Sequence, residues 1–168
     1  MQKLVIAWDL DGTLIDSSHR VKFNNGVFDM DHWLKYHNDI DTVGKDSLLP
    51  LVDLYREFSK SGFTQICVTA REMTEADFIF LEKNNLFFDM ILHRGDSHEL
   101  DSELKSRKLD NFLSAKGRIP FMAFDDKEEN LEVFDKYGFR TFQAIYMNEK
   151  LKKNSYSELE GIIPSLKG

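Results

Sequence analysis

The stretch AWDLDGTLID, residues 7–16, places Asp9 and Asp11 one residue apart, directly after an apolar run. Carboxylates in such a pair could act as a nucleophile, as a proton donor and acceptor, or as ligands of a hard cation. Gly12 and Thr13 follow, and an Asp-Gly pair after a strand is often only a turn. The motif indicates chemistry only if other reactive side chains gather at the same place.

Three further apolar runs lead into side chains that could act with this pair: a hydroxyl group, cations and more carboxylates. The run TQICVT ends at Thr69 and is followed by Ala70 and Arg71. The run DMILH leads through RGDSHELDSELK to Asp101, Lys105 and Lys108. The run PFMAF is followed by Asp125 and Asp126.

The apolar runs are short and rich in strand-forming residues, and segments with helical periodicity separate them. Strands are expected at residues 3–8, 64–69, 89–93, 120–124 and 140–145. Helices are expected within residues 47–62, 74–85, 101–117 and 127–138. Strands that alternate with helices are typical of crossover connections, so the sequence predicts an α/β fold with a mainly parallel sheet.

Ligands of an open parallel sheet bind at the carboxyl ends of its strands, where all the reactive residues named above are expected. Carboxylates held close together repel one another, and one of them takes up a proton unless a cation neutralises it. Mg²⁺ prefers oxygen ligands and also binds substrate phosphate. We therefore expect Mg²⁺ between Asp9 and Asp11 on one loop and Asp125 and Asp126 on another.

The run VIAWDLDGTL resembles the first motif of the haloacid-dehalogenase-like phosphohydrolase superfamily, in which apolar residues precede Asp-x-Asp-Gly-Thr. Thr69, Lys105 and the FDD run at 124–126 resemble its second, third and fourth motifs, in that order. The resemblance covers residues 4–126. It implies a Rossmann-like three-layer α/β sandwich with a small cap insert, and a Mg²⁺-dependent phosphatase.

For the reaction, the resemblance implies that Asp9 attacks phosphorus and forms an aspartyl-phosphate. Asp11 would protonate the leaving alcohol and then activate water, and its backbone carbonyl would bind Mg²⁺. Thr69 would donate a hydrogen bond to a phosphoryl oxygen, and Lys105 would hold the phosphate and offset the charge of Asp9. Lys108 lies one helical turn further on, and the spacing alone leaves either lysine as the inward one.

The remaining motif residues would bind the metal and the substrate. Asp125 and Asp126 would anchor the metal ion. Gly12 would allow a tight turn whose backbone N–H groups hold the phosphate.

Longer runs, among them VTAR and AFDDKEENLEVFDKYGFRTFQA, resemble the 3′-phosphatase domain of bacteriophage polynucleotide kinase-phosphatases. Arg71 and Arg20 correspond to arginines of that family. We assign substrate binding to both, together with Gly12 and Ala70. His98 and its neighbour occupy the region where the family usually has an arginine, and no part of the sequence resembles the kinase half.

Residues 15–47 interrupt the alternation and are expected to form a small flap or cap, with a short helix in DMDHWLKYH. A small flap leaves the site open to a bulky substrate such as a polynucleotide end. Its aromatic side chains could stack a base or pack the flap onto the body, and they are Phe23, Phe28, Trp33 and Tyr36.

Composition limits the other possibilities. The 168 residues are expected to form one domain, 1–168, and the net charge of −7 argues against a broad DNA-binding surface. Cys67 has no partner for an internal disulfide, and the five histidines lack zinc-site spacing. The N-terminus does not resemble a signal peptide and no run is long enough to cross a membrane, so a cytoplasmic protein without an obligate protein partner is expected. A terminal helix is expected to dock through Leu159 and Ile162.

Three hypotheses follow. The first is a phosphatase that removes a 3′-phosphate from a nucleotide or a polynucleotide end. The second is the same chemistry on a 5′-nucleotide or a small phosphometabolite. The third is a phosphate-binding protein without turnover, which the intact set of motif residues argues against.

Overall fold

A computed structural model describes residues 1–153, and its centre is a five-stranded parallel sheet with the order β7-β6-β1-β8-β9. The strands are β1 (Lys3–Trp8), β6 (Thr64–Val68), β7 (Met90–Leu92), β8 (Arg118–Asp125) and β9 (Arg140–Gln143). The strand order places β1 in the middle, and crossover connections place the later strands on its two sides. The predicted α/β class and the parallel sheet are confirmed.

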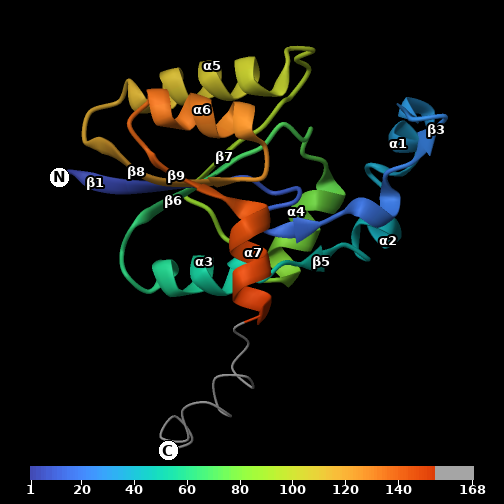
Figure 1. Cartoon of the computed structure of the whole chain (residues 1–168), viewed down its shortest axis with the longest axis horizontal. Coiled ribbons are helices and arrows are strands. Elements are labelled where there is room, and N and C mark those ends of the chain that lie inside the picture. The colour runs from blue at the N-terminus through green and yellow to red at the C-terminus, as the bar shows by residue number, and fades with distance from the viewer. Residues whose placement is uncertain (154–168) are drawn as a thin grey trace, which may run out of the picture.

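Helices cover both faces of this sheet, which completes a three-layer sandwich (Figure 1). One face carries α5 (Asp101–Leu113) and α6 (Glu128–Lys136). The other carries α3 (Leu51–Ser59), α4 (Glu75–Lys83) and α7 (Ala144–Lys153). Within residues 1–153, no helix has the length and apolar character needed to span a bilayer.

The alternation of side chains along β1 explains why its sequence is apolar throughout. Val5 and Ala7 pack under α5 and α6, whereas Ile6 and Trp8 pack toward α3 and α4. All four side chains are fully buried. A central parallel strand is covered on both faces, so a continuous apolar run is expected there instead of an alternating one.

The register of the sheet brings the ends of three neighbouring strands to the same level. Trp8 at the end of β1 lies opposite Cys67 on one side and Phe124 on the other. The rings of Trp8 and Phe124 stack with centroids 4.2 Å apart, and Phe124 stacks on Phe142 at 5.1 Å. Aspartates follow both Trp8 and Phe124 directly, so Asp9 and Asp125 lie next to this aromatic stack at the same edge of the sheet.

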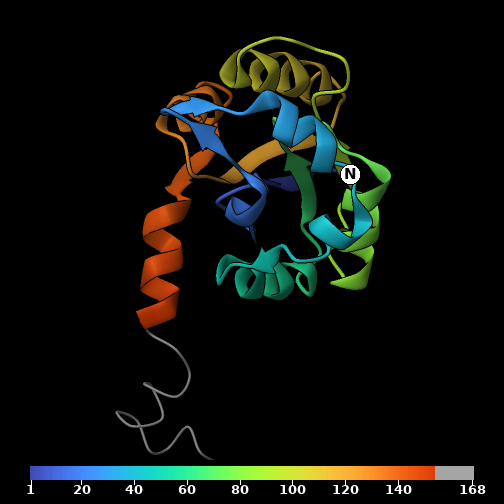
Figure 2. The same ribbon diagram turned by 90° about the vertical axis from the view of Figure 1, so that its right-hand side faces the viewer.

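Residues 15–48 form an insert that leaves and rejoins the body through one short antiparallel pair, β2 (Ile15–Asp16) and β5 (Ser47–Leu48). Between them lie a 3-10 turn at Ser18–Arg20, the hairpin of β3 (Phe23–Asn24) and β4 (Val27–Phe28), and helices α1 (Met30–Tyr36) and α2 (Ile40–Val43). Figures 1 and 2 show the insert at the end of the sheet away from the N-terminus. The carboxyl ends of the strands point to the same end.

Two of the differences between predicted and observed element boundaries have a clear local cause. The helix predicted within 47–62 begins only after Pro50, because Ser47 and Leu48 pair with β2 as a strand. The strand predicted at 140–145 ends at Gln143, because the side-chain Oε1 of Gln143 accepts hydrogen bonds from the N–H groups of Ile145 and Tyr146 and starts α7. The predicted terminal helix with Leu159 and Ile162 lies outside the described residues.

Candidate active site

A cavity of about 850 Å³ opens at the carboxyl ends of the strands, between the body and the insert. Such a volume accommodates a drug-sized or nucleotide-sized ligand. The body contributes most of the polar side chains and the insert contributes most of the apolar ones. Of the predicted site residues, the cavity is lined by Asp9, Asp11, Thr69, Ala70, Arg71, Lys105 and Asp126.

Asp9 lies at the inner end of this cavity and is almost fully buried. Its Oδ1 accepts a hydrogen bond from Lys105 Nζ at 2.9 Å, and its Oδ2 accepts one from Thr13 Oγ1 at 3.2 Å. Lys105 Nζ also donates to Asp125 Oδ2 at 2.5 Å. The structure therefore turns Lys105 inward, with 1% of the residue exposed, while Lys108 is only half-buried.

The buried charges shift one another's pKa. Burial raises the pKa of Asp9 well above its usual value, Lys105 counteracts this increase, and the charge of Asp125 adds to it. Burial alone would lower the pKa of Lys105, but the adjacent carboxylates of Asp9 and Asp125 raise it instead. Lys105 is therefore a fixed cation, and one cation does not fully compensate the carboxylates around it.

Three carboxylates meet at this point: Asp9, Asp125 and Asp126 each offer an oxygen within 4.8 Å of the others. The backbone N–H of Lys127 and Nδ2 of Asn130 hold Asp125 Oδ1 at 3.0 and 3.1 Å. Burial and the charge of Asp125 raise the pKa of Asp126. An all-oxygen donor set with excess negative charge fits a hard divalent cation such as Mg²⁺.

Asn130 adds a further polar group to this corner of the cavity. Its Oδ1 is buried and has no hydrogen-bond partner among the described residues. Buried acceptors are normally satisfied by a protein donor or an ordered water. A hydrated cation would bring water donors to this place, so the unpaired oxygen is consistent with the same donor set.

Gly12 allows the first loop to fold tightly against the last carboxylate. Its φ is +76°, a region that residues with a Cβ rarely adopt, and a Cβ at this position would lie 2.5 Å from Asp126 Oδ2. Gly12 does not line the cavity, so its predicted contact with substrate stays a prediction. Its position shows why glycine is required there.

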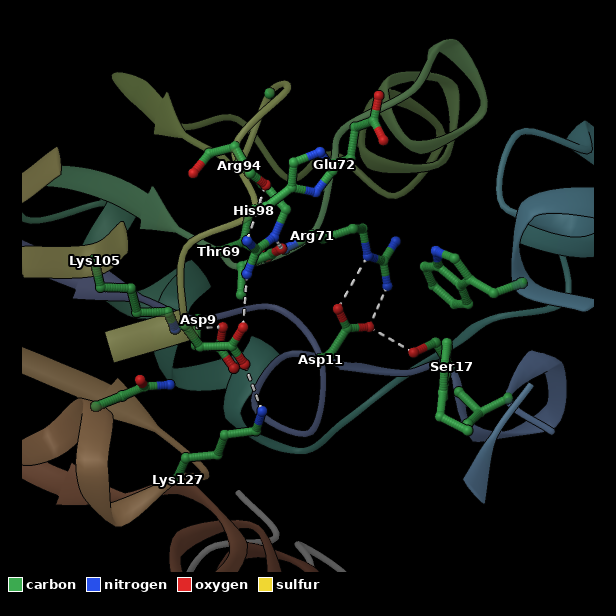
Figure 3. A pocket seen from close by; sticks show the side chains of 18 of the residues that line it. Asp9, Asp11, Ser17, Thr69, Arg71, Glu72, Arg94, His98, Lys105 and Lys127 are labelled. Carbon is green, nitrogen blue, oxygen red and sulfur yellow. Dashed lines mark hydrogen bonds and ion pairs between the residues drawn. The ribbon is translucent and has the colours of Figure 1, made fainter. Parts of the chain in front are cut away.

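The carboxylate of Asp11 points toward Arg71 and Ser17 rather than joining the acidic cluster (Figure 3). Arg71 donates to it through both Nε, at 3.0 Å, and Nη2, and Ser17 Oγ donates at 2.5 Å. Partial burial would raise the pKa of Asp11, but Arg71 and Ser17 together lower it below its usual value. The predicted side-chain role of Asp11 in proton transfer and the carbonyl contact to a metal stay predictions.

Arg71 and Arg20 belong to one buried ionic network that joins the insert to the body. Arg71 Nη1 donates to Asp77 of α4 at 2.5 Å. Arg20 donates to both oxygens of Asp46 at 3.1 and 3.0 Å, and Asp46 lies 3.7 Å from Arg71. Arg20 is 2% exposed and does not line the cavity. The structure thus places Arg71 at the cavity wall and Arg20 behind it.

Thr69 and Ala70 follow β6 directly and line the cavity next to Arg71. Thr69 Oγ1 accepts the N–H of Arg71 at 3.0 Å, which leaves its hydroxyl hydrogen for another acceptor. The carbonyl of Ala70 accepts Arg94 Nε at 2.8 Å. Arg94 also binds Asp101 at 2.7 Å, so it fixes the loop that leads into α5 and thereby Lys105.

Several residues of the site were not predicted from the sequence. Asp46 and Asp77 compensate the buried arginines, Ser17 holds Asp11, and Lys127 and Asn130 orient Asp125. The pattern Thr74-x-x-Asp77 predicts a helix N-cap, which the structure contains, but it does not predict the contact with Arg71. Asp46 carries no local motif, because its partner Arg20 lies 26 residues away in the chain, whereas Ser17, Lys127 and Asn130 lie within six residues of theirs.

Comparison with known proteins gives one family match that spans nearly the whole chain. Residues 1–165 match the family described as "Bacteriophage T5 5'-deoxynucleotidase". A protein of Escherichia phage T5 named 5'-deoxynucleotidase is 32% identical over a gapped alignment 172 positions long, which covers 88% of this chain and 69% of that protein.

Solved structures share the fold at low sequence identity. A chain of the Pnkp1/Rnl/Hen1 RNA repair complex superposes with a TM-score of 0.60 at 20% identity, over 84% of this chain and 42% of that chain. A haloacid dehalogenase-like family hydrolase from Streptococcus pneumoniae gives 0.60 at 15% identity, over 84% of each chain. The HAD-hydrolase YfnB of Bacillus subtilis, bound to magnesium, gives 0.56 at 10% identity, over 84% of this chain and 88% of that chain.

These matches agree with the order of motifs along the chain and with the sheet that carries them. The predicted superfamily and the predicted enzyme class are confirmed. The chain belongs to the family of the bacteriophage T5 5'-deoxynucleotidase, and it is a phosphatase of the haloacid-dehalogenase type.

Proposed function

We propose that the protein hydrolyses deoxynucleoside 5′-monophosphates to deoxynucleosides and inorganic phosphate. The family match over residues 1–165 supports the substrate class. The buried Asp9, held by Lys105 at 2.9 Å at the inner end of a nucleotide-sized cavity, supports the chemistry. The cavity is polar at the aspartates and apolar at the insert, which suits a ligand with a phosphate at one end.

In the first step, a carboxylate oxygen of Asp9 attacks phosphorus while the bond from phosphorus to the sugar oxygen breaks. Lys105 holds Asp9 in place and stabilises the negative charge of the phosphoryl group. Thr69 donates its hydroxyl hydrogen to a phosphoryl oxygen. Asp11 leaves Arg71, takes up a proton from solvent, and gives this proton to the departing sugar oxygen.

In the second step, water attacks the phosphorus of the aspartyl-phosphate. Asp11, now ionised, takes a proton from this water, and the bond between phosphorus and the Asp9 oxygen breaks. Inorganic phosphate leaves, and both aspartates return to their starting states. Two partial reactions at one carboxylate replace a single difficult displacement by water.

The residues present fit Mg²⁺, which Asp9, Asp125 and Asp126 would hold. When bound, the ion supplies positive charge beside the phosphate. The backbone carbonyl of Asp11 is assigned to the same ion by the resemblance to the superfamily. Asn130 and Lys127 keep Asp125 in place, so they support the donor set from behind.

A 3′-phosphate is the second candidate substrate. The runs VTAR and RGDSHELDSELK, which resemble 3′-phosphatase domains, favour it. The family match favours the 5′-phosphate and extends over more of the chain. The two candidates share the same reaction and differ only in how the sugar and base enter the cavity.

A substrate panel separates these candidates. Hydrolysis rates are compared for a deoxynucleoside 5′-monophosphate, the matching 3′-monophosphate and a 3′-phosphorylated oligonucleotide, with Mg²⁺ present. We expect the largest kcat/KM for the 5′-monophosphate. Faster turnover of either 3′-phosphate would reject the proposed substrate while leaving the reaction intact.

The nucleophile is tested with Asp9→Asn, and Asp53→Asn serves as the matched control because Asp53 is exposed on α3. We expect Asp9→Asn to lose turnover of every phosphomonoester, by at least roughly a thousandfold, and the control to keep it. Substantial hydrolysis by Asp9→Asn would exclude the aspartyl-phosphate.

A further inference from the structure

The side of the cavity that the insert forms is apolar and partly aromatic. It is lined by Val21, Phe28, Met30, Trp33 and Leu34. Phe28, Met30 and Leu34 are 37%, 55% and 56% exposed. Covering such exposed apolar side chains with a ligand is favourable, because it removes apolar surface from water. They line the same cavity as Asp9.

Trp33 differs from its neighbours because a buried arginine lies against its ring. The guanidinium carbon of Arg20 lies 5.0 Å from the centroid of the Trp33 ring. Arg20 is itself buried and is held by two hydrogen bonds to Asp46. A buried cation on an aromatic face is a stabilising contact, and it holds the ring in one orientation before any ligand arrives.

The body side of the cavity has the opposite character. The loop between β7 and α5 contributes Asp96, Ser97 and His98 to the lining, next to Arg94. Asp96 and His98 are exposed, and Figure 3 shows His98 beside Arg94. A ligand part between the two sides meets apolar surface on the insert and hydrogen-bonding groups on the body.

A nucleobase has this combination of an apolar face and a polar edge. We propose that Trp33 is the stacking platform for the base of the substrate and that Arg20 is the positioning residue that holds its ring. The proposal rests on the proposed function, because it assumes a nucleotide with its phosphate at Asp9. It assigns Arg20 an effect through Trp33 in place of a contact with the phosphate.

The test compares two substrates that differ only in the base: a deoxynucleoside 5′-monophosphate and 2-deoxyribose 5-phosphate. Trp33→Ala is measured beside Tyr36→Ala, which truncates another aromatic of the same helix that does not line the cavity. Stacking a base on an aromatic ring changes affinity by roughly tenfold or more. We expect Trp33→Ala to lower kcat/KM for the nucleotide about tenfold and to leave the sugar phosphate unchanged, with Tyr36→Ala altering neither.

Arg20→Lys keeps the charge opposite Asp46 but removes the planar group above the indole. We expect it to raise KM for the nucleotide several-fold more than KM for the sugar phosphate, while any change in kcat that passes through the Asp46–Arg71 contact is the same for both compounds. An arginine that contacts the phosphate would instead raise KM for both compounds equally. That result would overturn the role assigned to Arg20.

Binding is followed independently of turnover by tryptophan fluorescence in the Asp9→Asn protein. The chain has two tryptophans, and Trp8 is fully buried in the core, so a change on adding nucleotide reports on Trp33. We expect the nucleotide to quench the emission, 2-deoxyribose 5-phosphate not to, and Trp33→Phe to abolish the change. Equal losses for both substrates in Trp33→Ala, or no quenching, would overturn the platform.

Failure of the proposed function gives a different result. If a 3′-monophosphate is the better substrate, the proposed position of the phosphate is wrong, and the dependence on Trp33 is then measured on that nucleotide against 2-deoxyribose 3-phosphate. If the nucleotide and the base-free sugar phosphate react equally well in the unmodified protein, the phosphatase stands and the base platform is rejected.

Discussion

Arg71 binds the carboxylate of Asp11 through two nitrogens of its guanidinium, and its third nitrogen binds Asp77. The pair joins the loop after β1 to the loop after β6 across the cavity wall. Asp11 is consequently an anion in this state, whereas its proposed first task is to give up a proton. Substrate binding must therefore separate the two side chains.

This relationship predicts how the pH profile depends on Arg71. Arg71 lowers the pKa of Asp11, so Arg71→Gln is expected to raise that pKa. The protonated form of Asp11 then persists to higher pH, so the alkaline limb of the plot of log kcat/KM against pH shifts to higher pH. The limb of kcat/KM reports on the free enzyme, in which the contact exists. Arg140→Gln, at an exposed arginine of β9, is the control, and an unmoved limb in Arg71→Gln would reject Asp11 as the acid.

The proton transfers predict a dependence on the leaving group for Asp11→Asn. A deoxynucleoside is a poor leaving group and needs a proton, whereas p-nitrophenolate needs little help. We expect the first step to slow by about 10²–10⁴-fold with the nucleotide and much less with p-nitrophenyl phosphate. Because water attack also needs Asp11, p-nitrophenyl phosphate should give a burst followed by slow turnover. Equal slowing of the first step with both substrates would contradict the assignment.

Gly12 and Gly62 form a matched pair, because both have φ +76° but only Gly12 has a neighbour close to its missing Cβ. An alanine at either position is strained by about 1–2 kcal/mol of unfolding free energy. Gly12→Ala additionally displaces Asp126. We expect Gly12→Ala alone to lower activity and to weaken activation by Mg²⁺, as measured by a titration of the rate. Similar activities for the two variants would show that the close approach to Asp126 is unimportant.

The orientation of the two lysines of α5 predicts unequal effects. Lys105→Met removes the cation between Asp9 and Asp125, so we expect kcat to fall at least a hundredfold. Lys108→Met removes a half-buried side chain one turn away and should leave kcat unchanged. Thermal unfolding of both variants separates loss of chemistry from loss of structure. A fall in kcat with Lys108→Met alone would reverse the assignment.

The carboxylate cluster predicts a pH-dependent stability in the presence of a chelator. Asp9 and Asp126 have raised pKa values, so the folded state binds more protons than the unfolded state between the two pKa values of each group. The free energy of unfolding therefore decreases as the pH rises through the folded-state pKa. We expect urea unfolding without metal to show higher stability near pH 5 than near pH 7.

Mg²⁺ should remove that dependence, because a bound cation favours the ionised carboxylates and stabilises the folded state in proportion to its occupancy. Asp126→Asn should reduce both the pH effect and the stabilisation by Mg²⁺, and Asp53→Asn should change neither. A melting temperature that does not respond to Mg²⁺ in the unmodified protein would argue against the donor set.

The sequence predicted those parts of the molecule whose signals are local. Apolar runs of five or six residues marked the strands, and the motif at Asp9 and the pair Asp125–Asp126 followed directly from their ends. The structure brings these carboxylates and Lys105 together. The start of α7 was missed because a side chain, Gln143, provides the cap in place of the usual N-cap residues.

Several parts that were missed depend on contacts between segments far apart in the chain. The assignment of Arg20 to substrate binding stays a prediction, but no local pattern indicates that Asp46, which lies 26 residues further on and folds back through the β2–β5 pair, holds Arg20 behind the cavity wall. Asp77 contacts Arg71 from α4. The sequence predicted the N-terminal cap of this helix but not how the helix is oriented relative to Arg71. The orientation of Asp11 follows from these partners, so no local pattern could reveal it.

The aromatic stack of Trp8, Phe124 and Phe142 spans the strands that precede Asp9 and Asp125. The β1–β8 ladder sets the spacing of those two acids, and the stacked rings pack its end from within the interior. A smaller ring in the stack should therefore lower both the stability of the core and the rate of turnover, although none of the three rings lines the cavity.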